Sequence, residues 1–169
     1  MNDFTILIWL FPIVFMIHDF EEIIFLKYWI SKNMSYLAEK FPRISKRLLP
    51  RYANFSTAGF ALAVAEEFVL FSLVTVGSVI FENYVLWLAM FMGFFVHLLM
   101  HVCQWILVKR YIPAIYTSFF ALIYCIYTLY IILSNNIFSI SEIAVWTIIG
   151  LAAMGVNLLF AHTLARWVD

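Results

Sequence analysis

The chain has 169 residues, of which 66% are hydrophobic and 20% aromatic, and its 10 basic and 10 acidic residues give a formal net charge of zero. Soluble domains of this length rarely have such a composition, and the balanced charge gives no reason to expect a nucleic-acid partner. We therefore expect a single integral membrane domain that spans residues 1–169 and has membrane lipids as its surroundings.

Five apolar stretches are long enough to cross a hydrocarbon core of ~30 Å as helices. In chain order, they cover residues 4–26, 56–80, 84–108, 112–133 and 141–166. Helices are expected because lipid offers no partner for backbone polar groups. The first stretch lacks a basic start and a small-residue cleavage site, so we expect it to remain as a span. The sequence thus predicts an all-α, five-helix transmembrane bundle.

The basic residues lie on one side of this arrangement. Seven fall in the connection 27–55, Lys109 and Arg110 follow the third span, and Arg166 ends the fifth. The segments expected on the other side contain no Lys or Arg. By the positive-inside rule, the N-terminus lies outside and the C-terminus is cytoplasmic. For residues 27–55 we expect short amphipathic helices on the inner leaflet, with a partly ordered loop as the alternative.

Nine ionisable side chains lie at membrane depth in these spans, with no Lys or Arg among them. They are His18, Asp19, Glu21, Glu22, Glu66, Glu67, His97, His101 and His162. At a rise of ~1.5 Å per residue, most of them fall in the inner half of the bilayer. Because positions i, i+3 and i+4 share a helix face, His18, Glu21 and Glu22 should point the same way, as should His97 and His101.

Ionised acids at this depth need compensation. Each costs about 2.5–3.5 kcal/mol at the bilayer centre, so four unpaired glutamates would cost roughly 10 kcal/mol, as much as a whole domain's stability. Protonated acids, protonated histidines and bound cations are the available solutions. Histidine and carboxylate together are usual ligands of Zn, Fe or Mn, so we predict a divalent metal site. Its candidate ligands are His18, Glu21, Glu22, Glu66, His97, His101 and His162.

Four motifs resemble those of one protein family. They are "HDFEE" at 18–22, "AEEF" at 65–68, "HLLMH" at 97–101 and the late His162. With them the chain resembles the HXXEE-domain family of small bacterial integral membrane proteins. The resemblance implies His18, Glu21 and Glu22 as motif residues and the bacterial cytoplasmic membrane as the location. It implies no substrate, and the activity of the family is unassigned, although an enzymatic role has been suspected.

Several of these residues have structural alternatives. The three motif residues could form a hydrogen-bonded cluster that locks helix packing, and His162 could be an interfacial histidine. Glu66 and Glu67 point about 100° apart, so only one is expected to enter the site fully, and we favour Glu66. Asp19 lies off the face of the motif, which predicts a supporting or solvent-linked position.

The leading functional hypothesis is a metal-dependent membrane hydrolase that acts on a lipid-like substrate. The metal would lower the pKa of a bound water, and Glu22 or Glu66 would act as the general base. A di-iron oxidative enzyme is a variant. A proton- or cation-coupled transporter is the main alternative, although it would need a homo-oligomer and the chain shows no inverted repeat. Haem is least consistent, because His97 and His101 on one helix cannot bind opposite faces of one haem.

Overall fold

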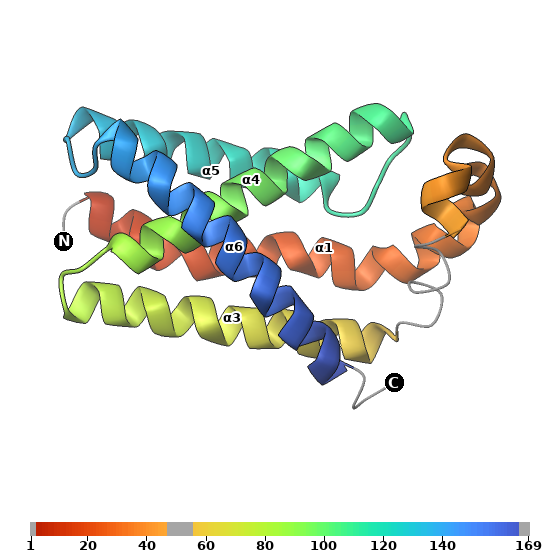
Figure 1. Ribbon diagram of the computed structural model, residues 1–169, viewed down its shortest axis with the longest axis horizontal. Coiled ribbons are helices and arrows are strands. Elements are labelled where there is room, and N and C mark those ends of the chain that lie inside the picture. The colour runs from red at the N-terminus through yellow and green to blue at the C-terminus, as the bar shows by residue number, and fades with distance from the viewer. Residues whose placement is uncertain (1–2, 47–55, 166–169) are drawn as a thin grey trace.

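The computed structural model describes residues 3–46 and 56–165, and this part of the chain contains helices and no β-strand. Five long helices follow one another (Figure 1): α1 (Asp3–Lys40), α3 (Thr57–Ile80), α4 (Val85–Val108), α5 (Ile115–Ser134) and α6 (Ile140–Ala165). All five are long and apolar enough to cross a membrane. The expected all-α architecture with five candidate spans is therefore confirmed, and the orientation of the termini remains a prediction.

Helix α1 is longer than the sequence indicated. Its predicted span ends at residue 26, but the helix continues to Lys40, and a short helical segment follows at residues 42–46. The hydropathy pattern marks only the end of the apolar stretch, whereas no Gly or Pro lies in residues 27–41 to end the helix there. The connection to α3 is correspondingly shorter than expected. Arg47 and Arg51 of that connection, like Arg166, lie outside the described residues.

The extension of α1 is held against the loop between α4 and α5. The Trp29 indole donates a hydrogen bond of 2.6 Å to the Tyr111 carbonyl oxygen. The Tyr36 hydroxyl and the Lys40 ammonium donate to the Val108 carbonyl oxygen over 2.6 and 2.9 Å. The last two bonds satisfy a carbonyl group that the end of α4 leaves unpaired, and the first ties the extension to the loop before α5.

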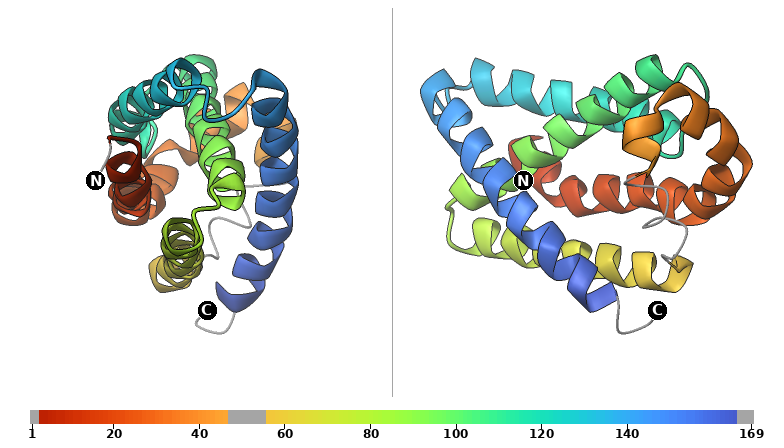
Figure 2. Two further views of the ribbon diagram at one scale, coloured as in Figure 1. Left: turned by 90° about the vertical axis from the view of Figure 1, so that its left-hand side faces the viewer. Right: turned by 45° about the vertical axis from the view of Figure 1, so that its right-hand side comes forward.

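Helix α1 packs between α3 and α5, whereas α6 covers α4 and α3 (Figure 2). The α4–α6 crossing is especially close. A Cβ atom on Gly150 would overlap the Ala89 carbonyl oxygen, and one on Gly93 would overlap the Met154 sulfur. Small residues allow such approach between membrane helices, where packing rather than water exclusion drives association. From this crossing α4 and α6 diverge towards the C-terminal end of each (Figure 1).

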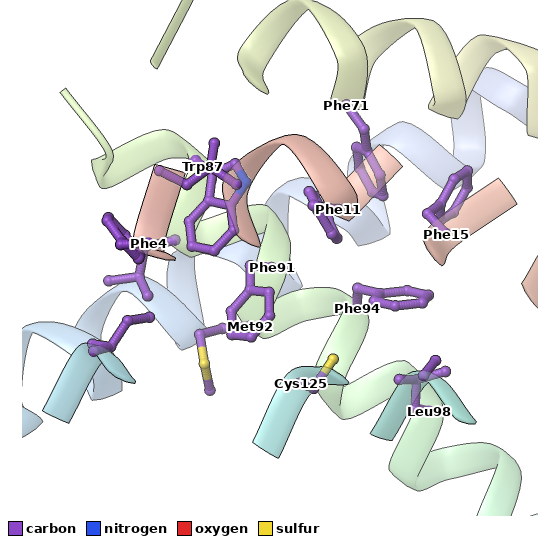
Figure 3. Packing of buried hydrophobic residues seen from close by; sticks show 14 of the residues in the cluster. Phe4, Phe11, Phe15, Phe71, Trp87, Phe91, Met92, Phe94, Leu98 and Cys125 are labelled. Carbon is purple, nitrogen blue, oxygen red and sulfur yellow. The ribbon is translucent and has the colours of Figure 1, made fainter. Parts of the chain in front are cut away.

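An aromatic core fills the space between α1, α3 and α4 (Figure 3). Phe71 lies between two residues of α1, with ring centroids 5.1 Å from Phe11 and 4.6 Å from Phe15. Phe94 of α4 closes this core from the other side, 5.8 Å from the Phe15 ring. The next ring along α1 is an imidazole, because the Phe94 ring also lies 5.6 Å from that of His18. The apolar core thus leads directly into a polar cluster.

Gly150→Ala should lower the free energy of unfolding by about 1–3 kcal/mol, because the added methyl meets backbone that cannot rotate away. Gly155→Ala on the same helix is the matched control, since nothing lies within 4 Å of a Cβ at that position. Thermal unfolding in detergent micelles would measure both. Equal effects of the two substitutions would contradict the close crossing.

Candidate functional site

Three imidazoles meet between α1 and α4. They belong to His18, His97 and His101, and one nitrogen of each lies within 4.8 Å of the others. The ring centroids are 5.4 Å apart for His18 and His97, 5.0 Å for His18 and His101, and 4.5 Å for His97 and His101. In residues 3–46 and 56–165, no other group of three His, Cys, Asp or Glu side chains is as compact. The structure therefore brings together three of the predicted ligands.

Two nitrogen atoms of this cluster lack a hydrogen-bond partner in the described part of the chain. The Nε2 atoms of His97 and His101 lie 3.0 Å apart, close enough to share a proton or to bind one cation. His18 is fully buried, and its Nε2 has no hydrogen-bond partner in the described part of the chain. The Nδ1 of His101 is buried and unpartnered there as well. Leaving a buried polar atom unpaired costs about 1–3 kcal/mol, so these nitrogen atoms are candidates to bind a ligand.

Glu22 supplies the carboxylate next to the imidazoles. Its Oε1 lies 3.8 Å from the Nε2 of His101, and its side chain is 17% exposed. In the described residues, no Lys or Arg forms an ion pair with a carboxylate, and this contact is an ion pair only if His101 is protonated. Glu22 thus lies near the cluster but farther away than a hydrogen bond, and its role as a ligand or base remains a prediction.

Glu21 points away from the imidazoles and towards the start of α5. Its Oε1 accepts a hydrogen bond of 2.8 Å from the Tyr111 hydroxyl. Its Oε2 accepts two more from Thr117, over 2.9 Å from the backbone N–H and 2.7 Å from the hydroxyl. A carboxylate is favourable at a helix N-terminus, where backbone N–H groups lack partners. The predicted ligand Glu21 is therefore compensated by α5 without a metal ion.

Tyr111 and Thr117 are the partners that the sequence reasoning did not identify. Burial, together with the hydrogen bond to the Glu21 carboxylate, raises the pKa of the Tyr111 phenol, which keeps it protonated as a donor. One sequence signal could have pointed to this arrangement. Residue 114, which precedes α5, is an alanine and provides no side-chain cap, so the helix start needs a distant acceptor.

The two acids of α3 share one neighbour on α6. The Glu66 Oε2 accepts a hydrogen bond of 3.1 Å from the Asn157 amide of α6. Glu67 also bonds to Asn157, and in addition it interacts electrostatically with Asp19 and Glu22 of α1. Asp19 is 5% exposed, and its Oδ2 has no partner in the described residues, so it is buried rather than solvent-linked. Of the α3 pair, Glu67 is thus the acid that approaches the motif helix.

The remaining predicted ligand, His162, lies on α6. Its side chain falls outside the described part of the structure, so its proposed role as a ligand remains a prediction.

Comparison with known proteins gives one family. The model of a family described as "protein of unknown function with HXXEE motif" matches residues 9–128, more than half of the chain. The matched range contains the three clustered histidines, the acids of the HXXEE motif, the two acids of α3 and Thr117, but it excludes α6. No curated protein and no solved structure matches the chain. The resemblance read from the motifs is thereby confirmed.

Glu21→Gln should destabilise the protein by about 1–3 kcal/mol, because an amide group cannot accept all three hydrogen bonds that the carboxylate accepts. Glu22→Gln, one residue later, should cost much less, since Glu22 accepts no hydrogen bond from α5 and lies near other acids. Unfolding in mixed micelles compares the two variants. A larger loss for Glu22→Gln would show that Glu21 does not anchor α5.

Proposed function

Because the chain belongs to the family of proteins of unknown function with an HXXEE motif, we propose a function from the site itself. In this proposal, His18, His97 and His101 bind a divalent metal ion, and the protein is a metal-dependent membrane enzyme, most simply a hydrolase. The observation that carries the proposal is the buried cluster of three imidazoles with unpaired nitrogen atoms.

The ligand set favours zinc. Three histidines with an open fourth position form a common catalytic zinc site, whereas Mn²⁺ prefers oxygen ligands and Fe also accepts imidazole. At Zn–N distances of about 2.0–2.1 Å, tetrahedral ligand atoms lie about 3.3 Å apart. The Nε2 atoms of His97 and His101 are already at 3.0 Å. The widest separation in the cluster, at most 4.8 Å, would have to shorten by an amount that side-chain rotation can supply.

The chemistry follows from the neighbouring carboxylate. A metal ion of this kind lowers the pKa of its bound water to about 7. Glu22 is the acid nearest to the imidazoles, so it would accept the proton of that water as the general base. With a metal ion bound, this chemistry would suit the cleavage of an ester-like bond, in which Glu22 would pass the proton on to the leaving group. Glu66, the other base that we considered, is less suited because it is bonded to Asn157.

The location of the site favours a lipid-like substrate. The three histidines belong to two candidate spans, and Glu22 and His97 are only partly buried, which leaves part of the site exposed at the surface of the bundle. With the orientation that the positive-inside rule predicts, the site faces the inner half of the bilayer. In a bacterial cytoplasmic membrane, which we propose as the location, lipids could reach it laterally.

A proton- or cation-coupled transporter is the second candidate. The observation that favours it is the row of acids Asp19, Glu22 and Glu67 beside the histidines, because intramembrane acids and histidines form relays in transporters. With five spans, such a transporter would act as a homo-oligomer. A carboxylate-bridged di-iron enzyme has less support, since Glu21 and Glu66 are engaged by Thr117 and Asn157.

Metal analysis of the protein purified without chelators should find about one zinc per chain, because the cluster offers one set of three imidazoles. His101→Ala should lose the metal, whereas Glu66→Gln should retain it, since Glu66 is bonded to α6 and not to the cluster. Size-exclusion chromatography in detergent would confirm that both variants fold.

Two outcomes would contradict the enzyme proposal. One is the absence of divalent metal from a folded wild-type protein even after zinc is added. The other is equal metal content in the wild type and His101→Ala. A metal-free protein that moves protons across vesicle membranes would favour the transporter.

A further inference from the structure

Thr117 connects the Glu21 carboxylate to His18. Its hydroxyl oxygen lies 2.7 Å from the Oε2 of Glu21 and 3.4 Å from the Nδ1 of His18. Glu21 and His18 are three positions apart on α1, so they share a face of that helix and meet the same residue of α5. The first glutamate of the motif thus reaches the histidine of the motif through a third side chain.

The Thr117 hydroxyl donates its hydrogen bond to Glu21. A hydroxyl has one proton to donate and lone pairs with which to accept. The Glu21 oxygen is its closest acceptor, while the carbonyl oxygens of Ala114 and His18 lie farther away, at 3.2 and 3.4 Å. A lone pair of the Thr117 oxygen is therefore left for His18. The contact of 3.4 Å is long for a hydrogen bond, and it is favourable only if Nδ1 carries the proton.

We propose that Thr117 is a positioning residue that holds His18 in the tautomer protonated at Nδ1. In a neutral imidazole, one nitrogen donates and the other accepts, so this tautomer leaves the lone pair on Nε2. That atom is the one that is buried and has no hydrogen-bond partner in the described part of the chain. The inference rests on the proposed metal site, because it assigns the Nε2 lone pair to the metal ion.

This arrangement would serve binding in two ways. The hydrogen bond restricts rotation of the ring, so the lone pair is aimed before the ion arrives. The Glu21 carboxylate, which accepts the proton of the Thr117 hydroxyl, also makes the Nε2 atom of His18 more basic and thus a stronger metal ligand. Hydrogen-bond partners of the second ring nitrogen generally have this effect on metal-bound histidines. Removing such a partner typically lowers metal affinity about 10–100-fold.

The chain offers a matched pair of variants. Thr117→Val removes the hydroxyl but keeps the shape of the side chain and the backbone N–H that bonds Glu21. Tyr111→Phe removes the hydroxyl on the other oxygen of Glu21 and has no contact with His18. Each variant removes one hydrogen bond to Glu21, and only Thr117→Val removes the contact with the His18 ring. Thr117→Val also removes the weaker contacts of the hydroxyl with the carbonyl oxygens of Ala114 and His18.

The first experiment titrates the detergent-solubilised full chain with Zn²⁺ and with Co²⁺, whose visible spectrum reports its ligands. Thr117→Val should bind both ions about 10–100-fold more weakly than the wild type. Thr117→Ser should restore the affinity, and Tyr111→Phe should stay close to the wild type. Equal losses for Thr117→Val and Tyr111→Phe, or an unchanged affinity in Thr117→Val, would overturn the positioning role.

The second experiment needs no metal and no variant of Thr117. Nitrogen NMR of the wild-type protein, stripped with a chelator and labelled at the histidine nitrogens, should show His18 protonated at Nδ1, with the signal assigned by its loss in His18→Gln. A proton on Nε2 would overturn the inference, whether or not the protein binds metal. Absence of metal binding together with an Nδ1 proton would reject the proposed function while supporting the hydrogen-bonded link.

Discussion

The structure depends on how polar side chains are satisfied inside a bundle that offers them no basic partner. The described spans place imidazoles and carboxylates together, and no Lys or Arg pairs with them. The Glu21 carboxylate is stabilised by hydrogen bonds from Tyr111 and from Thr117 at the start of α5. The three imidazoles have no such solution within the described residues, since nitrogen atoms of His18 and His101 stay unpaired. A bound cation is the partner that would complete them.

The residues of the HXXEE motif consequently have different surroundings although they share one helix face. His18 enters the cluster with His97 and His101. Glu21 anchors α5, and Glu22 lies beside His101. The i, i+3 and i+4 spacing puts all of them on the side of α1 that faces α4 and α5, and the direction of each side chain then selects its partner. The motif thus combines packing and chemistry in one turn and a half of helix.

The sequence predicted the elements of this arrangement better than its contacts. Hydropathy located the spans, and the four-residue spacing of His97 and His101 placed both in one site. The partners of Glu21 were not predictable in this way, because Tyr111 and Thr117 lie some 90 residues later, before and within the first turn of α5, and depend on where that helix starts. The choice between Glu66 and Glu67 depends on the rotation of α3, which composition does not specify. Helix α1 continues to Lys40, beyond the end of its apolar stretch at residue 26, because a loss of hydrophobicity does not by itself end a helix.

The claim that three imidazoles hold one metal ion is tested most directly by X-ray absorption spectroscopy of the metal-loaded protein in detergent. The account predicts a zinc edge with nitrogen and oxygen neighbours at about 2.0–2.1 Å and the outer-sphere scattering of three imidazole rings. Substitution of His18 should remove one ring from that scattering. A shell of sulfur or of carboxylate and water oxygens without imidazole scattering would contradict it.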